Sequence, residues 1–316
     1  MNEERLTLAE SKQKKRQRTV LRKTVSYILL SVLGISMIFP FIWMVSTSLK
    51  DPGDVFTYPP KWIPNPVRFD NYPKAWRAVP FPRGYINSIF IGVLTTIGQV
   101  ATSALAAYAF ARLRFPCRDQ LFLGYLATMM IPGSVTMIPV FILFRLMPEI
   151  MNKLTGSHFW DSDLYIGNFF IGKPIGIDSY FSLIVPALFS AYGTFMLRQF
   201  FMSIPRELED AAKIDGCSLF GIFWRIVLPL SKPALATLTT FTFMGSWSSF
   251  MWPLIVTNSM ELKTLPIMLA SFQGLYTTDW TLLMAGSIIV LIPVVIVFIF
   301  NQRYFVEGIK LTGIKG

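Results

Sequence analysis

The stretch Thr281–Phe300, TLLMAGSIIVLIPVVIVFIF, contains no charged residue and no histidine. A helix that crosses a bilayer needs about 20 consecutive, mostly apolar residues, and this stretch supplies them. The composition of the whole chain agrees, because 53% of its 316 residues are hydrophobic and 15% are charged. A soluble globular protein usually carries about 25% charged residues. The stretch therefore predicts a membrane-spanning helix.

Five further apolar stretches precede this one along the chain. They are Val25–Val45, Asn87–Ala111, Leu121–Phe144, Tyr180–Leu197 and Ala234–Val256. None has Asp, Glu, Lys, Arg or His in its interior, although the fourth is short and holds Pro186. The first is too long for the apolar region of a signal peptide, which spans about 7–15 residues. The sequence therefore predicts an all-α integral membrane protein with six transmembrane helices.

The distribution of Lys and Arg predicts the orientation, since cytoplasmic segments are enriched in both residues. With the N-terminus inside, 19 of the 29 basic residues fall in inside segments. We therefore expect a cytoplasmic basic tail (1–24), a membrane domain (25–300) and a cytoplasmic C-terminal tail (301–316). The basic run from Lys12 to Arg18 is also typical of nucleic-acid patches. Its place directly before a span favours contact with anionic lipid, so we expect the lipid bilayer as a partner and no nucleic acid.

The sequence lacks the patterns that would give this chain chemistry of its own. Gly308 and Gly313 have the separation of a Walker A loop, but Ile314 follows where Lys is required. No Cys/His cluster has metal-ligand spacing. No span carries the ionisable group that ion-coupled transport usually needs. We therefore expect no catalytic residue, no metal and no cofactor bound by this chain, and an external source of energy if it moves a solute uphill.

The inside segment of about 198–233 carries the most regular polar pattern. Pro205 suits the first turn of a helix, and acidic residues follow where the helix dipole favours them. Gly216 is a natural helix stop, and Ser218 can cap a second helix that Pro229 limits. The pattern predicts two short helices around a glycine joint. An ordinary amphipathic helix on the membrane surface is an alternative interpretation of the same residues.

The same segment resembles the EAA loop of bacterial ABC-importer permeases. That loop reads Glu-Ala-Ala, three residues, Gly, nine residues, Ile, one residue, Leu-Pro. The matching positions here hold Asp210-Ala211-Ala212, Gly216, Ile226 and Leu228-Pro229. The one departure is Asp210, which keeps the charge of Glu and shortens the reach. The resemblance implies a MetI-like ABC importer permease bundle with a cytoplasmic EAA coupling helix.

The resemblance extends over nearly the whole chain. Pro205–Gly216, Phe243–Leu254 and Gln302–Gly308 look like the carbohydrate-uptake branch, in particular its MalG-like subunit. It implies a permease that translocates a carbohydrate across the bacterial cytoplasmic (inner) membrane and is no enzyme itself. The partners it implies are a MalF-like second permease, two ATPase subunits that hold ATP and Mg, and an extracytoplasmic sugar-binding protein. A permease of the same superfamily for a non-sugar solute is the alternative.

The resemblance also implies which residues dock on the ATPase. These are Glu207, Glu209, Asp210, Ala211, Ala212, Gly216, Leu228 and Pro229. The tail Val306–Gly316 would lie against the ATPase pair. The outside loop 148–179, which includes the lone His158 as an expected surface residue, looks longer than is usual for this branch. We expect it to touch the binding protein or the partner permease.

Four residues near the fifth span are candidates for the solute path. They are Trp247, Ser248, Ser249 and Trp252. Aromatic rings can stack on sugar faces and hydroxyl groups can bond to them, which suits a carbohydrate. Ser248 and Ser249 stand where the family often has Asn-Asp, so the departure leaves the ligand open. Simple packing between helices is the other interpretation of all four residues.

Overall fold

The computed structural model describes residues 2–167, 169–274 and 278–312. The regular elements that it describes are fourteen α-helices, one two-stranded hairpin, five short 3-10 helices and one π-helical segment. The helices are α1 Asn2–Ser48, α2 Asn71–Ala78, α3 Phe81–Arg112, α4 Arg118–Ala127, α5 Gly133–Thr155, α6 Tyr180–Ile184, α7 Ala191–Met202, α8 Arg206–Ile214, α9 Leu219–Ile222, α10 Leu228–Leu230, α11 Lys232–Trp247, α12 Met251–Val256, α13 Leu265–Ala270 and α14 Trp280–Thr312. The strands are β1 Leu164–Ile166 and β2 Phe169–Gly172. The predicted mainly helical fold is confirmed, and the hairpin is an addition that the sequence patterns did not indicate.

Five helical runs are long and apolar enough to cross a membrane. They are Thr19–Ser48, Phe81–Arg112, Gly133–Thr155, Tyr180–Met202 and Trp280–Phe300. The segments Leu219–Leu230 and Lys232–Trp247 meet at Ser231 with a bend of 79°. If they are counted as one run, they make a sixth span. The prediction of a six-helix membrane bundle is therefore confirmed by length and composition.

Three of the predicted spans are interrupted in the structure, and one of them, Tyr180–Leu197, breaks between α6 and α7. The stretch Leu121–Phe144 is not one helix, because the chain leaves helical geometry at Ile131 and Pro132 and restarts as α5. Proline has no backbone N–H and disfavours helical geometry in the residue before it, which explains the break. The stretch Ala234–Val256 likewise breaks after Trp247, and its last part becomes the separate helix α12.

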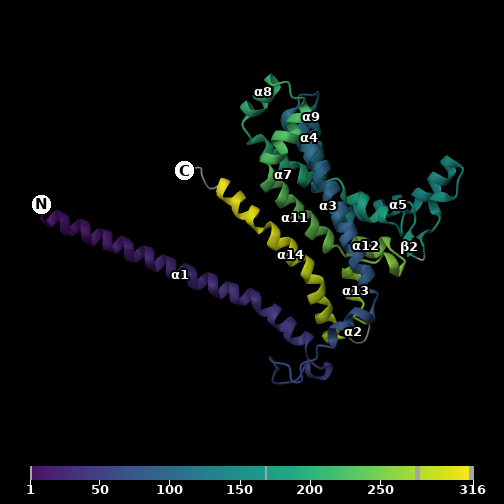
Figure 1. The fold of residues 1–316 in the computed structure, drawn as a ribbon, viewed down its shortest axis with the longest axis horizontal. Coiled ribbons are helices and arrows are strands. Elements are labelled where there is room, and N and C mark those ends of the chain that lie inside the picture. Colours follow the sequence, from purple (N-terminus) through teal and green to yellow (C-terminus); the bar gives the residue numbers. More distant parts are fainter. Residues whose placement is uncertain (1, 168, 275–277, 313–316) are drawn as a thin grey trace.

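The helix α3 lies at the centre of the bundle, with α7 and α11 against it (Figure 1). Small residues on α3 allow this close approach, as they do in membrane helices generally. Ala104, Ala107 and Ala111 are all buried in one core cluster with Leu197 of α7 and Leu238 of α11. The three helices therefore form the scaffold on which the functional segments are mounted.

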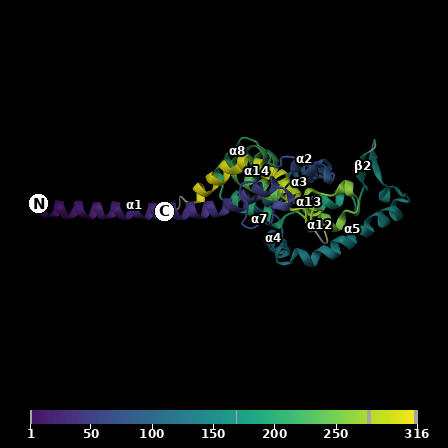
Figure 2. The same cartoon turned by 90° about the horizontal axis from the view of Figure 1, so that it is seen from below.

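The helix α1 projects away from this bundle (Figures 1 and 2). None of the residues in its most apolar 18-residue window is buried. It meets the rest of the chain near its C-terminal end, where Phe39 and Trp43 pack against Trp62 at ring-centroid distances of 5.4 and 5.1 Å. A long apolar helix with bare sides can be stable only against lipid or another protein.

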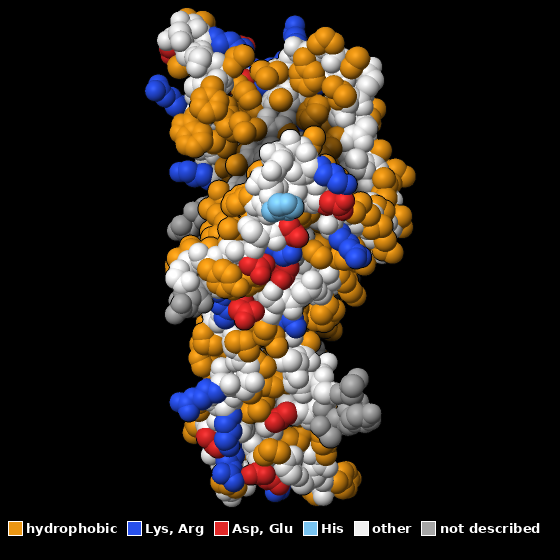
Figure 3. Space-filling model, turned by 90° about the vertical axis from the view of Figure 1, so that its right-hand side faces the viewer, with side chains coloured by type: hydrophobic (Ala, Val, Ile, Leu, Met, Phe, Trp, Pro, Cys, Tyr) orange, Lys and Arg blue, Asp and Glu red, His pale blue; other side chains and the backbone are white. Residues whose placement is uncertain are grey.

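The described residues of 156–179 form a projection beyond the end of α5. Its antiparallel hairpin pairs Leu164 with Gly172 and Tyr165 with Phe170. Charged side chains of both signs gather on this face of the molecule, around the single histidine (Figure 3). His158 is exposed, as the sequence indicated. The projection is tied to the bundle by Asp178, whose carboxylate accepts hydrogen bonds from the backbone N–H groups of Asn258 and Ser259 at 2.9 and 3.0 Å.

Candidate functional site

The segment after α7 folds as two short helical runs at one end of the bundle (Figure 1). Pro205 directly precedes α8, and Gly216 follows it with φ at +81°. The N–H of Cys217 donates to the carbonyl of Ala212 at 2.9 Å, which closes the helix end. The hydroxyl of Ser218 accepts from the N–H of Gly221 at 3.1 Å and caps the next run. The predicted pair of helices around a glycine joint is therefore confirmed.

The helix α8 has one outward face and one inward face. Glu207, Asp210 and Ala211 are exposed on the outward face, and Gly216 is exposed just beyond the helix. The docking residues that the EAA resemblance implies also include Glu209 and Ala212, which lie on the inward face. Both are buried against the bundle, because they lie three residues apart on the apolar side of the helix.

Glu209 forms an ion pair with Arg112 at the end of α3. The distance between Arg112 Nε and Glu209 Oε1 is 2.7 Å, and the two side chains are 4% and 7% exposed. Arg112 Nη2 also donates to the carbonyls of Phe201 and Ile204 at 2.7 and 2.6 Å. One guanidinium group therefore joins α3, the end of α7 and α8. The sequence interpretation missed Arg112, although a basic residue at the end of a span was visible.

Asp210 lies on the outward face of α8 beside Lys213. The Lys213 Nζ donates to Asp210 Oδ1 at 2.8 Å. This hydrogen bond, with the charge of Lys213, holds the pKa of the Asp210 carboxyl below its usual range. The carboxylate is therefore ionised at neutral pH and available to a basic partner.

The run after Ser218 connects α8 to α11. It contains a π-helical segment, Phe223–Val227, directly before Leu228 and Pro229. Leu228 is half-buried against the same core cluster as Ala212, and Pro229 is exposed. The 79° bend at Ser231 then turns the chain into α11. The path from α8 to α11 therefore runs through the turn at Gly216, the short helical runs after Ser218 and the bend at Ser231.

The four predicted solute-path residues separate into two pairs in the structure. Trp247 is buried, its indole N–H donates to the carbonyl of Val290 at 3.1 Å, and its ring stacks on Phe243. Ser248 is exposed and donates to the carbonyl of Met244 at 2.7 Å. Neither is a lining residue of the cavity described below. Ser249 and Trp252 do line it.

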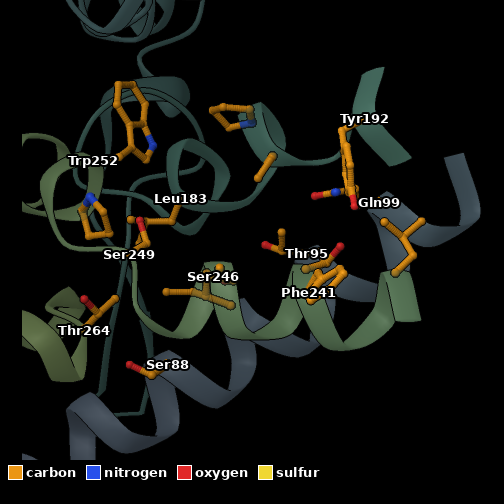
Figure 4. A pocket seen from close by; sticks show the side chains of 17 residues that line it. Ser88, Thr95, Gln99, Leu183, Tyr192, Phe241, Ser246, Ser249, Trp252 and Thr264 are labelled. Carbon is orange, nitrogen blue, oxygen red and sulfur yellow. The ribbon is translucent and has the colours of Figure 1, made fainter. Parts of the chain in front are cut away.

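This cavity has a volume of about 430 Å³ and lies where α3, α6, α7, α11 and α12 meet (Figure 4). Ser88, Thr95 and Gln99 come from α3, and Ser246 comes from α11. Figure 4 shows Tyr192, Trp252 and Thr264 around the same open space. The indole N–H of Trp252 donates to the carbonyl of Ser182 at 2.8 Å, which fixes the ring at the cavity wall.

The sequence interpretation missed most of the cavity wall. The missed polar residues are Ser88, Thr95, Gln99, Tyr192, Thr242, Ser246 and Thr264. A signal was present on α3, since its three polar lining residues recur at spacings of seven and four and so share one helix face. On α11 the same holds for Thr242 and Ser246. Such uncharged polar stripes within apolar spans could have indicated the cavity.

The residues that the structure describes contain no group of three or more His, Cys, Asp or Glu that could hold a metal ion.

Comparison with known proteins then gives the family. Residues 99–310 match the family described as binding-protein-dependent transport system inner membrane component. The chain belongs to this family.

This inner membrane component is similar to permeases along nearly its whole length. It is 33% identical over 297 residues to the arabinooligosaccharides transport system permease protein AraQ of Bacillus subtilis, covering 93% of this chain and 95% of that protein. It is 33% identical over 295 residues to the sn-glycerol-3-phosphate transport system permease protein UgpE of Yersinia pestis, covering 90% and 94%. The inner membrane component is therefore a permease subunit of an ABC importer and not an enzyme, since the ATPase of such importers is a separate subunit.

The fold of the inner membrane component also matches a solved structure. The crystal structure of a bacterial ABC transporter involved in the import of the acidic polysaccharide alginate contains a chain that superposes with a TM-score of 0.71. The match covers 90% of this chain and 96% of that chain at 23% identity. The likeness confirms the ABC importer permease fold that the EAA resemblance implied.

Proposed function

We propose that this permease is the MalG-like half of the membrane pore of a carbohydrate importer. The observation that carries the proposal is the outward face of α8, because it presents Asp210, Ala211 and Gly216 at one end of the bundle while α3 holds its inward face. Similarity to AraQ over nearly the full length supports a saccharide as the solute. An oligosaccharide is the form we propose.

The outward face of α8 and the residues that follow it would form the docking surface for an ATPase subunit. The residues we propose for it are Glu207, Asp210, Ala211, Gly216, Leu228 and Pro229. Asp210 would pair with a basic residue of the ATPase, and the two small residues would let its backbone come close. Glu209 and Ala212 would act from the inward face by holding α8 on the bundle. ATP and Mg would be bound by the ATPase subunits alone.

The remaining partners follow from the family and from the bare surface of the bundle. The family description names a binding protein on which transport depends, and an extracytoplasmic sugar-binding protein is the form we propose. The bare sides of α1 support a second, MalF-like permease beside this one. Both termini would be cytoplasmic. The tail Val306–Gly316 would contact the ATPase pair. The side chains of this tail lie outside the described part of the structure.

The test is purification of the tagged chain from its native membrane, followed by reconstitution of the whole complex in proteoliposomes. We expect two ATPase subunits, a second permease and a binding protein to co-purify. ATP-dependent uptake of an oligosaccharide, measured over a panel of labelled glycans with the binding protein added, should follow. A complex whose ATPase responds to a peptide or an inorganic anion and to no glycan would overturn the carbohydrate assignment in favour of the non-sugar alternative.

A further inference from the structure

Three threonine hydroxyl groups in the cavity wall have no hydrogen-bond partner. These are the Oγ1 atoms of Thr95, Thr242 and Thr264, whose residues are 2%, 7% and 5% exposed. All three residues line the cavity described above, and they come from α3, α11 and the residue before α13. Most buried hydroxyl groups in proteins are paired. Three unpaired hydroxyl groups around one cavity therefore offer hydrogen-bond partners to a molecule that enters it.

Thr96 of α3 and Thr240 of α11, which do not line this cavity, are each satisfied within their own helix. Thr96 Oγ1 donates to the carbonyl of Gly92 at 2.6 Å. Thr240 Oγ1 donates to the carbonyl of Ala236 at 2.9 Å. A helical threonine readily makes this bond to the preceding turn. Thr95 and Thr242 do not make it, so their hydroxyl groups stay available to a molecule in the cavity.

The cavity wall carries no charge. None of its 17 lining residues is Asp, Glu, Lys, Arg or His. An anionic solute would lose its hydration there without gaining a counter-charge, which is unfavourable in a buried site. An uncharged polyol would exchange water for hydroxyl and amide partners, and its C–H faces would meet Phe241, Tyr192 and Trp252. The volume of about 430 Å³ lies within the range of small-ligand sites.

We propose that this cavity is a saccharide subsite carried by this subunit itself, and that it accepts uncharged sugar units and excludes anionic ones. The proposal rests on the proposed function, because it assumes that a carbohydrate crosses this bundle. Under this proposal the permease differs in the charge of its solute from the two similar proteins whose described solutes are sn-glycerol-3-phosphate and alginate. Both of those solutes carry negative charge. Thr95, Thr242 and Thr264 would be the donors and acceptors that recognise the sugar.

The test compares Thr→Val variants in the complete reconstituted transporter. Thr95→Val, Thr242→Val and the double variant remove the hydroxyl groups and keep the shape of the side chains. Thr240→Val is the matched control, because Thr240 is buried on the same helix as Thr242 and lies off the cavity. The probes are uncharged arabino-, malto- and xylo-oligosaccharides and the acidic oligogalacturonates and oligoalginates. Initial rates of ATP-dependent uptake are measured against probe concentration.

We expect wild type to import at least one uncharged probe and no acidic one. The KM for that probe should rise about fivefold for each cavity hydroxyl removed, as expected for loss of one neutral hydrogen bond. Thr240→Val should leave it unchanged. The melting temperature of the cavity variants should be equal to or above that of wild type, because an unpaired buried hydroxyl does not stabilise the fold. A purely structural role would instead lower it.

Each other outcome decides a different claim. Uncharged uptake with an unchanged KM in the double variant would overturn the subsite and leave the proposed function standing. Import of an acidic probe at a rate comparable with the uncharged ones would overturn the selectivity. Failure of wild type to import any glycan, in a complex that hydrolyses ATP in response to another solute, would overturn the proposed function itself.

Discussion

Arg112 is the residue on which the position of α8 depends most directly. Its guanidinium lies within 2.7 Å of Glu209 and of two backbone carbonyls, and the side chains of Arg112 and Glu209 are only 4% and 7% exposed. A buried ion pair contributes little net stability compared with an apolar pair, yet breaking one side of it is costly. The pair therefore acts mainly to fix which way α8 faces.

Arg112→Met is expected to destabilise the protein by about 3–5 kcal/mol, because Glu209 is left as an uncompensated buried charge. The double variant Arg112→Met/Glu209→Met should recover part of that loss, since no charge is then unpaired. Denaturant unfolding in detergent, followed by tryptophan fluorescence, measures both. A single variant as stable as wild type would show that the pair is not buried in the assembled protein.

Gly216 has a left-handed backbone conformation in open surroundings. Its φ is +81°, and a Cβ added there would meet no atom within 4 Å. Within this chain, only the backbone conformation at position 216 disfavours a residue other than glycine. A steric clash with a larger side chain there would have to come from a partner protein. Asn tolerates this conformation better than other non-glycine residues.

Gly216→Asn is expected to keep most of the transport activity, whereas Gly216→Trp should uncouple ATP hydrolysis from transport. The bulky ring would keep the ATPase subunit from the proposed docking surface while the chain still inserts. Sugar-stimulated ATPase activity and uptake of the reconstituted complex are the measurements. Full stimulated ATPase activity in Gly216→Trp would contradict the docking role.

At the scale of elements, the contact of α7 with α3 and α11 depends on Gly193. A Cβ at this position would come within 2.6 Å of Ser103 Oγ and 3.2 Å of both Leu238 Cδ atoms. The three helices are therefore as close at this point as a glycine permits. Because α7 leads directly into α8, the position of α7 also sets the position of α8.

Gly193→Val is expected to destabilise the protein by about 1–3 kcal/mol, the usual cost of overpacking a core. The control is Gly124→Val, since Gly124 of α4 has no atom within 4 Å of an added Cβ. Thermal unfolding of the two purified variants in the same detergent gives the comparison. Equal melting temperatures would mean that α7 can shift away from α3 without loss.

At the scale of the whole molecule, the end of the bundle that carries α8 and the hairpin projection at its side differ in character (Figure 1). The end with α8 presents the outward face of that helix, and the hairpin projection carries charges of both signs (Figures 1 and 3). Cys117 and Cys217, both free, lie in segments that the basic residues predict to be cytoplasmic. Ser157 lies in the projection predicted to be outside.

Cysteine labelling tests this orientation. In right-side-out vesicles, a membrane-impermeant maleimide should leave Cys117 and Cys217 unlabelled and should label Ser157→Cys in a background without the native cysteines. In inverted vesicles the pattern should reverse, with exposed Cys117 labelled more strongly than half-buried Cys217. Labelling of Cys117 from the outside would reverse the proposed topology of the chain.

The sequence by itself determined the class of the protein and the local geometry of the segment around Gly216. Runs of about 20 apolar residues can be stable only across a bilayer, and the turn at Gly216 depends on neighbouring residues along the chain. Such local requirements are readable without knowledge of distant contacts. The break at Pro132 was also local, and the proline that causes it was visible.

Only the tertiary structure decided which face of each helix carries function. Glu209 and Asp210 are adjacent acids in the sequence, yet one is buried against Arg112 and the other is exposed, because the partner is 97 positions away. Trp247 and Trp252 differ in the same way, since the first packs against Phe243 and only the second reaches the cavity. A cavity wall assembled from five helices depends on long-range packing, which no single stretch of sequence contains.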